Sequence, residues 1–469
     1  MPLEANSTKR PAQPDILESS VYQRKRYQGK DSKLLLSIDL GTTFSAASFC
    51  ILAPRSLPTL EAVRCFRISA ESDFKVPTVL YYDYAGKAHI WGAQTTDEDY
   101  IAEAQRKGLI KVEWFKLALR PPYLSSSDVS PSVADITHTN LPTLPIFIPI
   151  EKAYTDFLRF ILEHIEEFFC KHHASGKDIW DQLFPTAEVI LTIPNGWEIK
   201  QQSQVREAAV AAGFVGKIGD ARNLEEGMQR IHFLSEAEAA MIYAMDSGYI
   251  NSWIQPGKDI LLCDAGGGTI DLTAYTITRK QPLQVKERLA SQCIVAGAVF
   301  INQQARRHLS ERLQGTFWDI PWKIDDLVMF FERTTKKTFS HLNKYYGLGR
   351  AGSENIPEAG VSNGRFYIRG TQVARFFEPT LNAIKAGIEH AYNQSGGTIK
   401  NVVMVGGLMN SSHAFSQLRA WGHDKGIQFS KPDGTMAKSV SHGALLWYLT
   451  KPVKSHIAKF HYGTDICPP

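Results

Sequence analysis

A glycine-rich stretch near the middle of the chain constrains the fold more than any other feature of the sequence. Residues 264–272 read Asp-Ala-Gly-Gly-Gly-Thr-Ile-Asp-Leu and lie between the apolar run 260–263 and the segment 273–276. This pattern predicts a strand, a tight turn and a second strand. Glycines permit positive φ and carry no Cβ, so successive backbone N–H groups of the turn can point at one anion. The stretch therefore predicts a phosphate-binding hairpin, and an ordinary β-hairpin is the alternative.

The same pattern occurs near the N-terminus. The apolar run 34–38 ends in Asp39, and Gly41, Thr42 and Thr43 follow within the next few residues. Two hairpins of one kind, far apart in the chain, predict two similar lobes. Each lobe would offer one hairpin to the phosphates of a single nucleotide.

Polar side chains flank the central turn. Asp264 and Asp271 stand at its mouth, where carboxylates can hold a hydrated Mg²⁺ rather than repel a phosphate directly. The hydroxyl of Thr269 adds a hydrogen-bond donor. These residue types suit phosphoryl transfer, which depends mainly on positioning and electrostatics.

Length and charge limit the classes of protein and partner. A chain of 469 residues is too long for one compact core, and 43% hydrophobic with 21% charged residues is ordinary for a globular protein. The net charge of +4 is small, and no apolar run approaches the roughly 18 residues of a membrane span, so we expect neither nucleic acid nor a membrane as partner. Several of the six cysteines lie in apolar runs, which favours a reducing, cytoplasmic location, and the lack of Cys-x-x-Cys spacing makes a zinc site improbable. The basic cluster 24–26 leaves the nucleus open.

The two hairpins resemble the phosphate loops of the actin, hexokinase and 70-kDa heat-shock ATPase superfamily. The segments 38–45, Ile-Asp-Leu-Gly-Thr-Thr-Phe-Ser, and 264–272 are most similar to its DnaK-type branch. The resemblance implies an α/β, two-lobed actin-like ATPase fold, in which duplicated ribonuclease-H-like lobes enclose a nucleotide cleft. It covers residues 34 to about 450, so we expect a divergent, short member without the family's substrate-binding domain. The expected organisation is a disordered tail over 1–33, lobe I over 34–253 and lobe II over 254–469.

The resemblance also suggests roles for an acid and a lysine. Glu236 matches an acid that contacts the hydrated metal and positions water, and Lys116 matches a lysine that reaches the γ-phosphate end. A first-turn carboxylate favoured by the helix dipole and a solvated helix lysine are the structural alternatives. Ser235 before the helix is a good N-cap, with Glu238 as its capping-box partner.

Further motifs of the family concern the adenosine end of the nucleotide. Lys336 and Ser340 lie four residues apart in a segment, 331–340, that resembles the helix over adenine and ribose; a solvated lysine face is the alternative. A strand over 401–405 is followed by two glycines, where a side chain would collide with a flat base, and Leu408-Met409-Asn410 replaces the family's usual Ser-Thr-Arg. The implied catalytic residues are Lys116, Glu236, Thr269 and Asp271; the nucleotide-binding residues are Gly41, Thr42, Thr43, Gly266, Gly267, Gly268, Gly297, Lys336, Ser340, Gly406 and Gly407; and the ligands of Mg²⁺, through water, are Asp39, Asp264 and Asp271.

The remaining expectations concern secondary structure. Apolar periodicity predicts helices over 151–170, 197–212 and 373–392, and segment 113–119 is expected to be helical. Residues 120–149 and 347–364 are rich in turn-forming residues and predict, respectively, an irregular connection and an exposed loop.

The resemblance implies a heat-shock-70-like module that binds ATP or ADP with Mg²⁺, hydrolyses ATP slowly and changes conformation for a protein partner or co-chaperone. A chaperone role and ATPase activity follow as expectations. A nucleotide-binding pseudo-ATPase scaffold is the alternative. A small-molecule kinase of the same superfamily is a third interpretation, although residues 194–197 carry no sugar-site signature.

Overall fold

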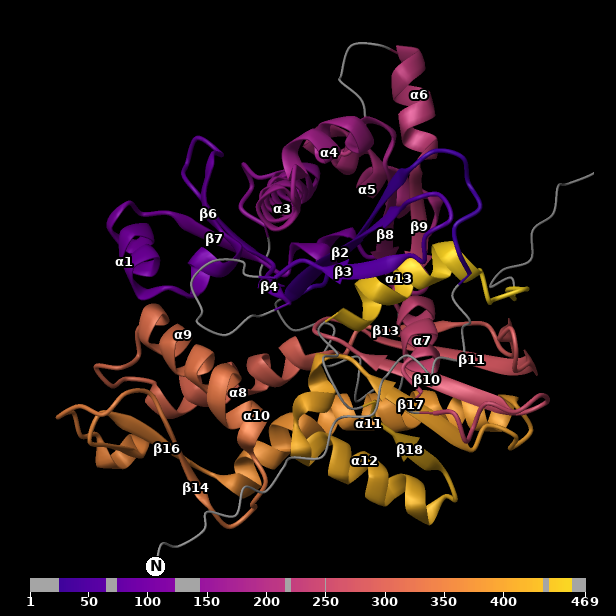
Figure 1. Ribbon diagram of the computed structural model, residues 1–469. Coiled ribbons are helices and arrows are strands. Elements are labelled where there is room, and N and C mark those ends of the chain that lie inside the picture. Colours follow the sequence, from indigo (N-terminus) through magenta and orange to yellow (C-terminus); the bar gives the residue numbers. More distant parts are fainter. Residues whose placement is uncertain are drawn as a thin grey trace, which may run out of the picture.

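The computed structural model describes residues 25–64, 74–122, 144–215, 221–248, 250–432 and 438–457 (Figure 1). Residues 1–24 of the expected tail and 123–143 of the expected irregular connection lie outside the described residues. Tyr27, within the expected tail, exchanges backbone hydrogen bonds with Arg55 and Ser56. None of the helices in the described ranges is long and apolar enough to cross a membrane.

The first half of the chain is built around a mixed sheet with the strand order β3-β2-β1-β8-β9. Strands β1 and β2 form the antiparallel hairpin that ends at Asp39, and β8 and β9 run parallel to β1. The short strand β4 pairs with β2 off this path. The strands are β1 (Lys33–Asp39), β2 (Phe44–Leu52), β3 (Thr59–Ala62), β4 (Val76–Pro77), β8 (Glu188–Ile193) and β9 (Ile231–Ser235).

The second half repeats this arrangement in the order β12-β11-β10-β17-β18. Again an antiparallel hairpin, β10–β11, is followed by two parallel strands, and β13 pairs with β11 off the path. Both expected strand–turn–strand hairpins are therefore confirmed. The repeated topology is compatible with a two-lobed actin-like fold. The strands are β10 (Asp259–Ala265), β11 (Ile270–Arg279), β12 (Gln284–Glu287), β13 (Gln292–Ile294), β17 (Asn401–Val405) and β18 (Gln428–Ser430).

Two helices lie between the sheets and pack against each other: α7 (Glu236–Asp246) and α13 (Ser439–Thr450) (Figure 1). α7 follows the first sheet in sequence but contacts β10 and β11, whereas α13, late in the chain, contacts β1 and β2. Ser37 Oγ donates to Ser441 O at 2.7 Å and fastens α13 to the first sheet. The two halves thus share one buried layer, formed by residues such as Leu35, Ile190, Ala240, Leu262, Val403 and Leu445.

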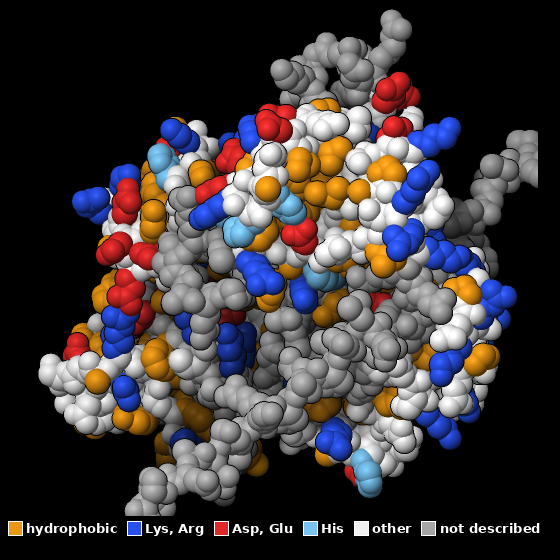
Figure 2. Space-filling model, in the orientation of Figure 1, with side chains coloured by type: hydrophobic (Ala, Val, Ile, Leu, Met, Phe, Trp, Pro, Cys, Tyr) orange, Lys and Arg blue, Asp and Glu red, His pale blue; other side chains and the backbone are white. Residues whose placement is uncertain are grey.

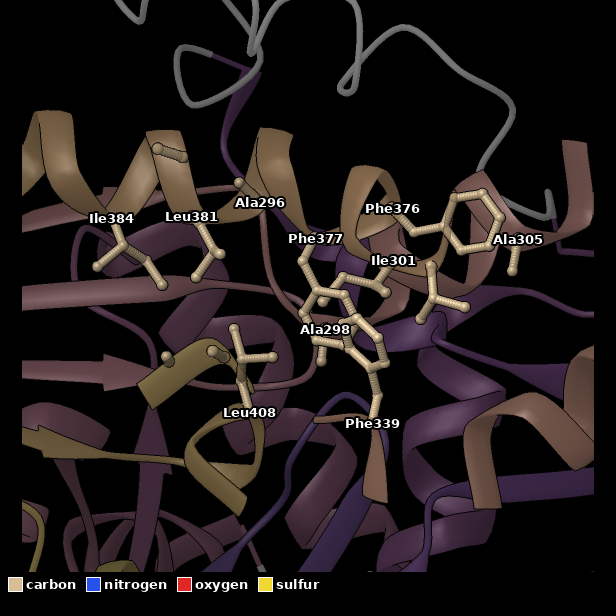
Figure 3. Packing of buried hydrophobic residues seen from close by; sticks show 14 of the residues in the cluster. Ala296, Ala298, Ile301, Ala305, Phe339, Phe376, Phe377, Leu381, Ile384 and Leu408 are labelled. Carbon is tan, nitrogen blue, oxygen red and sulfur yellow. The ribbon is translucent and has the colours of Figure 1, made fainter. Parts of the chain in front are cut away.

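Long helices cover the outer face of each sheet. Their apolar stripes pack against the sheets and against one another, and Figure 3 shows the packing among helical residues in the second half, where Phe376, Phe377, Leu381 and Ile384 lie near Ile301 and Leu408. The helices of the first half are α3 (Ile150–His172), α4 (Gly176–Leu183), α5 (Ile199–Ala212) and α6 (Ala221–Gln229), with a 3₁₀ turn at Phe184–Thr186. Those of the second half are α8 (Ala298–Leu313), α11 (Gly370–Gln394) and α12 (Ser412–Asp424), with a 3₁₀ turn at Gly407–Asn410.

Each half also carries a small three-stranded sheet beside the main one. Glu98 and Arg350 form an ion pair between the two small units. The first unit contains β5 (Val79–Tyr82), β6 (Ala88–Trp91), β7 (Ile110–Glu113), α1 (Glu98–Arg106) and 3₁₀ turns at Gly92–Thr96 and Phe115–Leu119. The second contains α9 (Pro321–Phe330), a π turn at Phe331–Thr335, α10 (Lys336–Thr338), β14 (Tyr345–Leu348), β15 (Val361–Ser362), β16 (Arg365–Arg369) and a 3₁₀ turn at Pro357–Ala359.

The expected long helices are confirmed as α3, α5 and α11, and α5 ends at Gly213, whose φ of 100° only glycine adopts readily. Three local predictions are wrong in part. Segment 113–119 is the end of β7 followed by a 3₁₀ turn, because Trp114 has a left-handed backbone. The expected loop 347–364 contains parts of β14 and β15, because Leu348 and Val361 are buried against Phe366. The helix expected over 331–340 ends at Thr338.

Candidate functional site

The tips of the two hairpins meet, although their sequences lie more than two hundred residues apart. A Cβ on Gly268 would lie 2.6 Å from the hydroxyl oxygen of Thr42, and one on Gly267 would clash with the Thr43 side chain. Glycines permit positive φ, but Gly266, Gly267 and Gly268 are not among the positive-φ residues of this structure. Glycine is required in this turn because the first hairpin and the start of α8 approach it so closely.

The N-terminus of α8 packs on the second turn. The backbone N–H of Gly297 donates to Gly268 O at 3.0 Å, and that of Val299 donates to Gly267 O at 2.8 Å. A Cβ on Gly297 would lie 2.5 Å from Gly267 O. Gly297 therefore fixes the shape of the turn, and the first N–H groups of the helix are occupied by the turn's own carbonyl groups.

Three carboxylates lie beside the tips. Asp39 ends β1, and Asp264 and Asp271 face each other across the β10–β11 hairpin. Their exposed fractions are 4%, 8% and 2%. Burial raises the pKa of Asp264 to about 7, and the neighbouring charge of Asp271 acts in the same direction. Asp271 accepts a hydrogen bond from the backbone N–H of Asn195 at 2.8 Å, but burial still raises its pKa.

Lys116 and Glu236 form a buried ion pair next to these carboxylates. Lys116 comes from the 3₁₀ turn after β7, and Glu236 is the first residue of α7. Burial raises the pKa of Glu236 to about 8; Lys116 opposes this effect, while Asp39 and Asp271 add to it. The structure thus brings the two residues of the implied acid–lysine pair into contact, and the alternative of a solvated lysine is wrong, since Lys116 is only 3% exposed.

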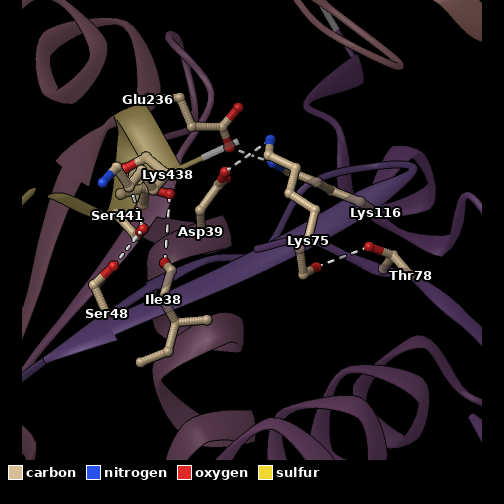
Figure 4. A network of polar contacts seen from close by, with 11 residues as sticks. Ile38, Asp39, Ser48, Lys75, Thr78, Lys116, Glu236, Lys438 and Ser441 are labelled. Carbon is tan, nitrogen blue, oxygen red and sulfur yellow. Dashed lines mark hydrogen bonds and ion pairs between the residues drawn. The ribbon is translucent and has the colours of Figure 1, made fainter. Parts of the chain in front are cut away.

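Lys75 is a further cation at this site that the sequence did not single out. Its Nζ lies 3.5 Å from Asp39 Oδ2, and Figure 4 shows Lys75 and Lys116 on one side of the network, with Asp39 and Glu236 on the other. Its charge lowers the pKa of Asp264. Its position in the sequence could have indicated this role. Lys75 directly precedes β4, and β4 pairs with the first residues of β2 and so lies beside the first turn.

The charges of the site are suited to a divalent cation. When ionised, Asp39, Glu236, Asp264 and Asp271 carry two more negative charges than Lys75 and Lys116 offset, in a largely buried setting. Uncompensated buried charge is costly, and Mg²⁺ is bound by few carboxylates with several retained waters. Within the described ranges, no three His, Cys, Asp or Glu side chains are grouped closely enough to ligate a metal directly. The residues therefore fit a hydrated Mg²⁺ rather than a dehydrated one.

The residues expected at the adenosine end differ in burial and in what they contact. Gly406 has φ of 91° and is packed against Ala265 O, so it is required by the fold, whereas Gly407 is exposed and no heavy atom of the described residues lies within 4 Å of its Cβ position. Lys336 is buried, and its ammonium group donates to Asn302 Oδ1 at 2.8 Å and Glu332 Oε1 at 3.2 Å. Ser340 is exposed beyond the end of the helix, so it does not share a helical face with Lys336 as expected.

Comparison with known proteins gives one distant similarity. No family model matches the chain. The chain is 23% identical over 295 residues to heat shock 70 kDa protein 12B of Homo sapiens. This match covers 52% of the chain and 40% of the human protein, so the chain spans less than half of that relative's length. The similarity suggests an Hsp70-like relative and hints at a nucleotide-binding module.

Proposed function

We propose that this chain is a heat-shock-70-like module that binds ATP with Mg²⁺ between its two glycine hairpins and hydrolyses it slowly. The observation that carries the proposal is the meeting of two matching hairpins, from two sheets of the same topology, beside buried carboxylates and two lysines. The distant human relative supports the same class. The proposed lobes are residues 34–253 and 254–469, in an actin-like arrangement with a nucleotide cleft between them.

The turns would bind the phosphates through backbone N–H groups, with hydroxyl donors from Thr42, Thr43 and Thr269. Thr43 now contacts Gly267, so a phosphate chain requires the two tips to separate. α7 and α13 are the shared layer about which the halves would move. Nucleotide entry is therefore proposed to accompany opening between the halves, and nucleotide exchange to change their closure.

The buried polar groups would bind the metal, balance charge and orient water. Asp39, Asp264 and Asp271 would hold the waters of Mg²⁺, which would screen the charge of the phosphates when bound. Lys116 would partly give up its ion pair with Glu236 and interact with the γ-phosphate. Glu236 and Thr269 would then orient the attacking water. Lys75 lies on the side of the first turn and would add a second positive charge near the phosphates.

A nucleotide-binding pseudo-ATPase is the second candidate, and one observation favours it. Lys116 and Glu236 are already paired with each other, and this pair engages both side chains that the ATPase mechanism needs for the phosphate and the water. A carboxylate held by a lysine is a weaker acceptor for the attacking water, which would slow or prevent turnover. In either case the output would be read by a protein partner or co-chaperone, in the cytoplasm or nucleus, and a chaperone role is part of this proposal.

Isothermal titration with ATP and ADP in Mg²⁺, together with a phosphate-release assay, tests the proposal. The site variant is Gly267→Asp, which places a bulky anion against Thr43. The matched control is Gly108→Asp, since Gly108 is an exposed turn residue and nothing in the described structure lies within 4 Å of its Cβ position. Its φ of 63° lies in the left-handed region, which aspartate adopts more readily than most other residues. Binding that only Gly267→Asp abolishes, with slow phosphate release, supports an ATPase. Binding without release supports the pseudo-ATPase, and no binding by the folded wild type refutes both.

A further inference from the structure

One edge of the second sheet carries exposed cations; Lys454 Nζ donates to Lys451 O at 2.9 Å, and Lys451 Nζ lies over the Trp447 ring. Among the described residues, no carboxylate forms an ion pair with any of the six exposed cations there. Figure 2 shows blue side chains gathered along the right-hand edge, where Figure 1 places the β11–β12 hairpin. We call this surface the basic edge; its residues are Lys258, Arg279, Lys280, Lys286, Lys451 and Lys454.

The basic edge is assembled from two distant parts of the chain. After α13 the segment 451–457 runs back along β12, where Val453 pairs in parallel with Val285. Lys454 N donates to Val285 O at 2.9 Å, so Lys286 and Lys454 follow the bridged pair on neighbouring strands. Neighbouring strands lie about 4.8 Å apart, and like charges at such positions are destabilising. The fold therefore places these two cations on neighbouring strands, where both would attract the same anion.

The nearby acids do not neutralise this surface. Asp259 is buried and accepts hydrogen bonds from Thr276 at 2.6 Å and Thr398 at 2.5 Å. Glu287 accepts from the Ile457 N–H at 2.6 Å and faces His456. Between residues 247 and 287 the only other acids are the site residues Asp264 and Asp271. Every acid of this stretch is thus turned inward or already engaged, while its four basic residues face outward.

The chain itself has no strongly acidic segment that could cover the basic edge. Residues 1–24 and 458–469, at the two ends, each contain as many acidic as basic residues. Of the internal segments outside the described residues, 123–143 has the largest acidic excess, and this consists of Asp128 and Asp135 alone. These segments therefore supply little complementary charge, which favours another molecule as its source.

We propose that the basic edge binds an acidic segment of a protein partner. This inference goes beyond the proposed nucleotide function and does not depend on it. None of the exposed aromatic side chains in the described structure lies on β11, β12 or segment 451–457, so bases of a single-stranded nucleic acid would find no stacking platform. Ile457 is the one large exposed apolar residue of these described elements, which leaves little to insert into a membrane. Flexible acidic side chains need only the charges that are present.

The physical signature of such a contact is its dependence on salt. The six cations are exposed, so their attraction for an anion is screened over about 8 Å at physiological ionic strength. Charges of this kind mainly govern the rate of association and the choice of partner. Binding should therefore weaken steeply as salt is added, unlike binding driven by apolar burial.

The test uses the full chain and a fluorescein-labelled peptide of about eight glutamates, followed by fluorescence anisotropy. The edge variant is Arg279→Glu with Lys280→Glu, two exposed residues at the end of the β11–β12 hairpin. The control is Lys200→Glu with Arg419→Glu, which makes the same change in net charge at exposed sites on α5 and α12. α12 contacts β18, at the opposite end of the second sheet. We expect the edge variant to bind about tenfold more weakly or worse, and the control to match the wild type.

Three results would overturn the proposal. The first is no binding of the peptide by the wild type. The second is a loss of affinity in the control as large as in the edge variant. The third is tighter binding of uridine oligonucleotides or phosphatidylserine vesicles of matched charge to the basic edge than of the peptide. The last result would replace a protein partner by a nucleic acid or a membrane. Thermal melting checks that each variant folds. An ATP titration of the edge variant keeps this test separate from the nucleotide proposal, because failure of ATP binding leaves the peptide result intact.

Discussion

The glycines of the site differ in what surrounds the position where a Cβ would stand. Gly406 combines positive φ with close packing on Ala265 O. Gly407 is exposed, and no described residue lies within 4 Å of its Cβ position. The sequence predicted both positions, since a strand followed by paired glycines is a local pattern. It could not tell which glycine serves the fold and which one is free to serve a ligand.

Gly407→Ala should therefore leave stability nearly unchanged while weakening ATP binding, because the added methyl group occupies space that the proposal gives to the nucleotide base. Gly406→Ala should lower the free energy of unfolding by about 1–3 kcal/mol, through strain and overpacking. Urea unfolding and ATP titration of both variants measure the two effects. Equal losses of stability in both would mean that Gly407 is also structural.

Lys75 offers a second prediction at this scale. Lys75→Met should weaken ATP binding by about tenfold or more, since hydrogen bonds to charged groups are worth roughly 1.5–3 kcal/mol. Lys75→Arg keeps the charge and should retain most of the affinity. Titration with ATP decides between a binding role and a purely structural pairing with Asp39, because in the latter case neither variant changes the affinity of the folded protein.

Among the elements, α7 and α13 pack closely at a glycine. A Cβ on Gly443 of α13 would overlap Ala239 O of α7, and that atom belongs to the backbone and cannot turn aside. Gly387, in the middle of α11, would instead meet the end of the Leu272 side chain at 2.5 Å. The two glycines provide a matched pair of helical sites with different neighbours.

Gly443→Ala should destabilise the protein by about 1–3 kcal/mol or more, as forced overpacking does. Gly387→Ala should cost less, because Leu272 can change rotamer and alanine favours the helix by about 1 kcal/mol. Denaturant unfolding of both variants gives the comparison. A smaller loss for Gly443→Ala than for Gly387→Ala would contradict the packing of these two helices.

The segment 451–457 is held on β12 by a titratable cluster. His456 lies 3.9 Å from Glu238 and 3.7 Å from Glu287, and Glu238 is buried with one oxygen atom that finds no hydrogen-bond partner in the described part of the chain. Ser235 caps α7 by accepting from the Glu238 N–H, as expected, but the side chain of Glu238 faces His456 and does not complete a capping box. The pattern of four residues predicted the cap; it could not reveal a partner from the far end of the chain.

This cluster should loosen as the pH rises. Burial raises the pKa of Glu238 to about 7. The pKa of His456 is also raised, chiefly by its hydrogen bond to Glu287. Groups with raised folded-state pKa values stabilise the fold at low pH, and this contribution is lost as the pH rises through about 7. Hydrogen exchange should give higher protection factors for the Val285, Glu287 and Lys454 amides at pH 6 than at pH 8. His456→Ala should reduce this difference, and identical pH profiles in the variant and the wild type would argue against the cluster.

At the scale of the whole molecule, the repeated sheets and the shared layer of α7 and α13 explain how distant hairpins meet. Local patterns in the sequence predicted both hairpins and most long helices, because strand, turn and cap signals are short. They did not predict the strands within 347–364, the contact of segment 451–457 with β12, or Lys75 beside Asp39. These features depend on pairings between residues remote in sequence, which no local pattern encodes.

Hydrogen exchange followed by mass spectrometry, with and without Mg²⁺ and ATP, tests the central claim most directly. The account predicts that residues 39–45 and 264–270, on two different sheets, both gain protection, and that neither does with Mg²⁺ alone. Gly267→Asp should remove the effect at both hairpins together. Protection at only one hairpin, or at neither with ATP well above saturating concentrations for this class of protein, would contradict a nucleotide site shared by the two halves.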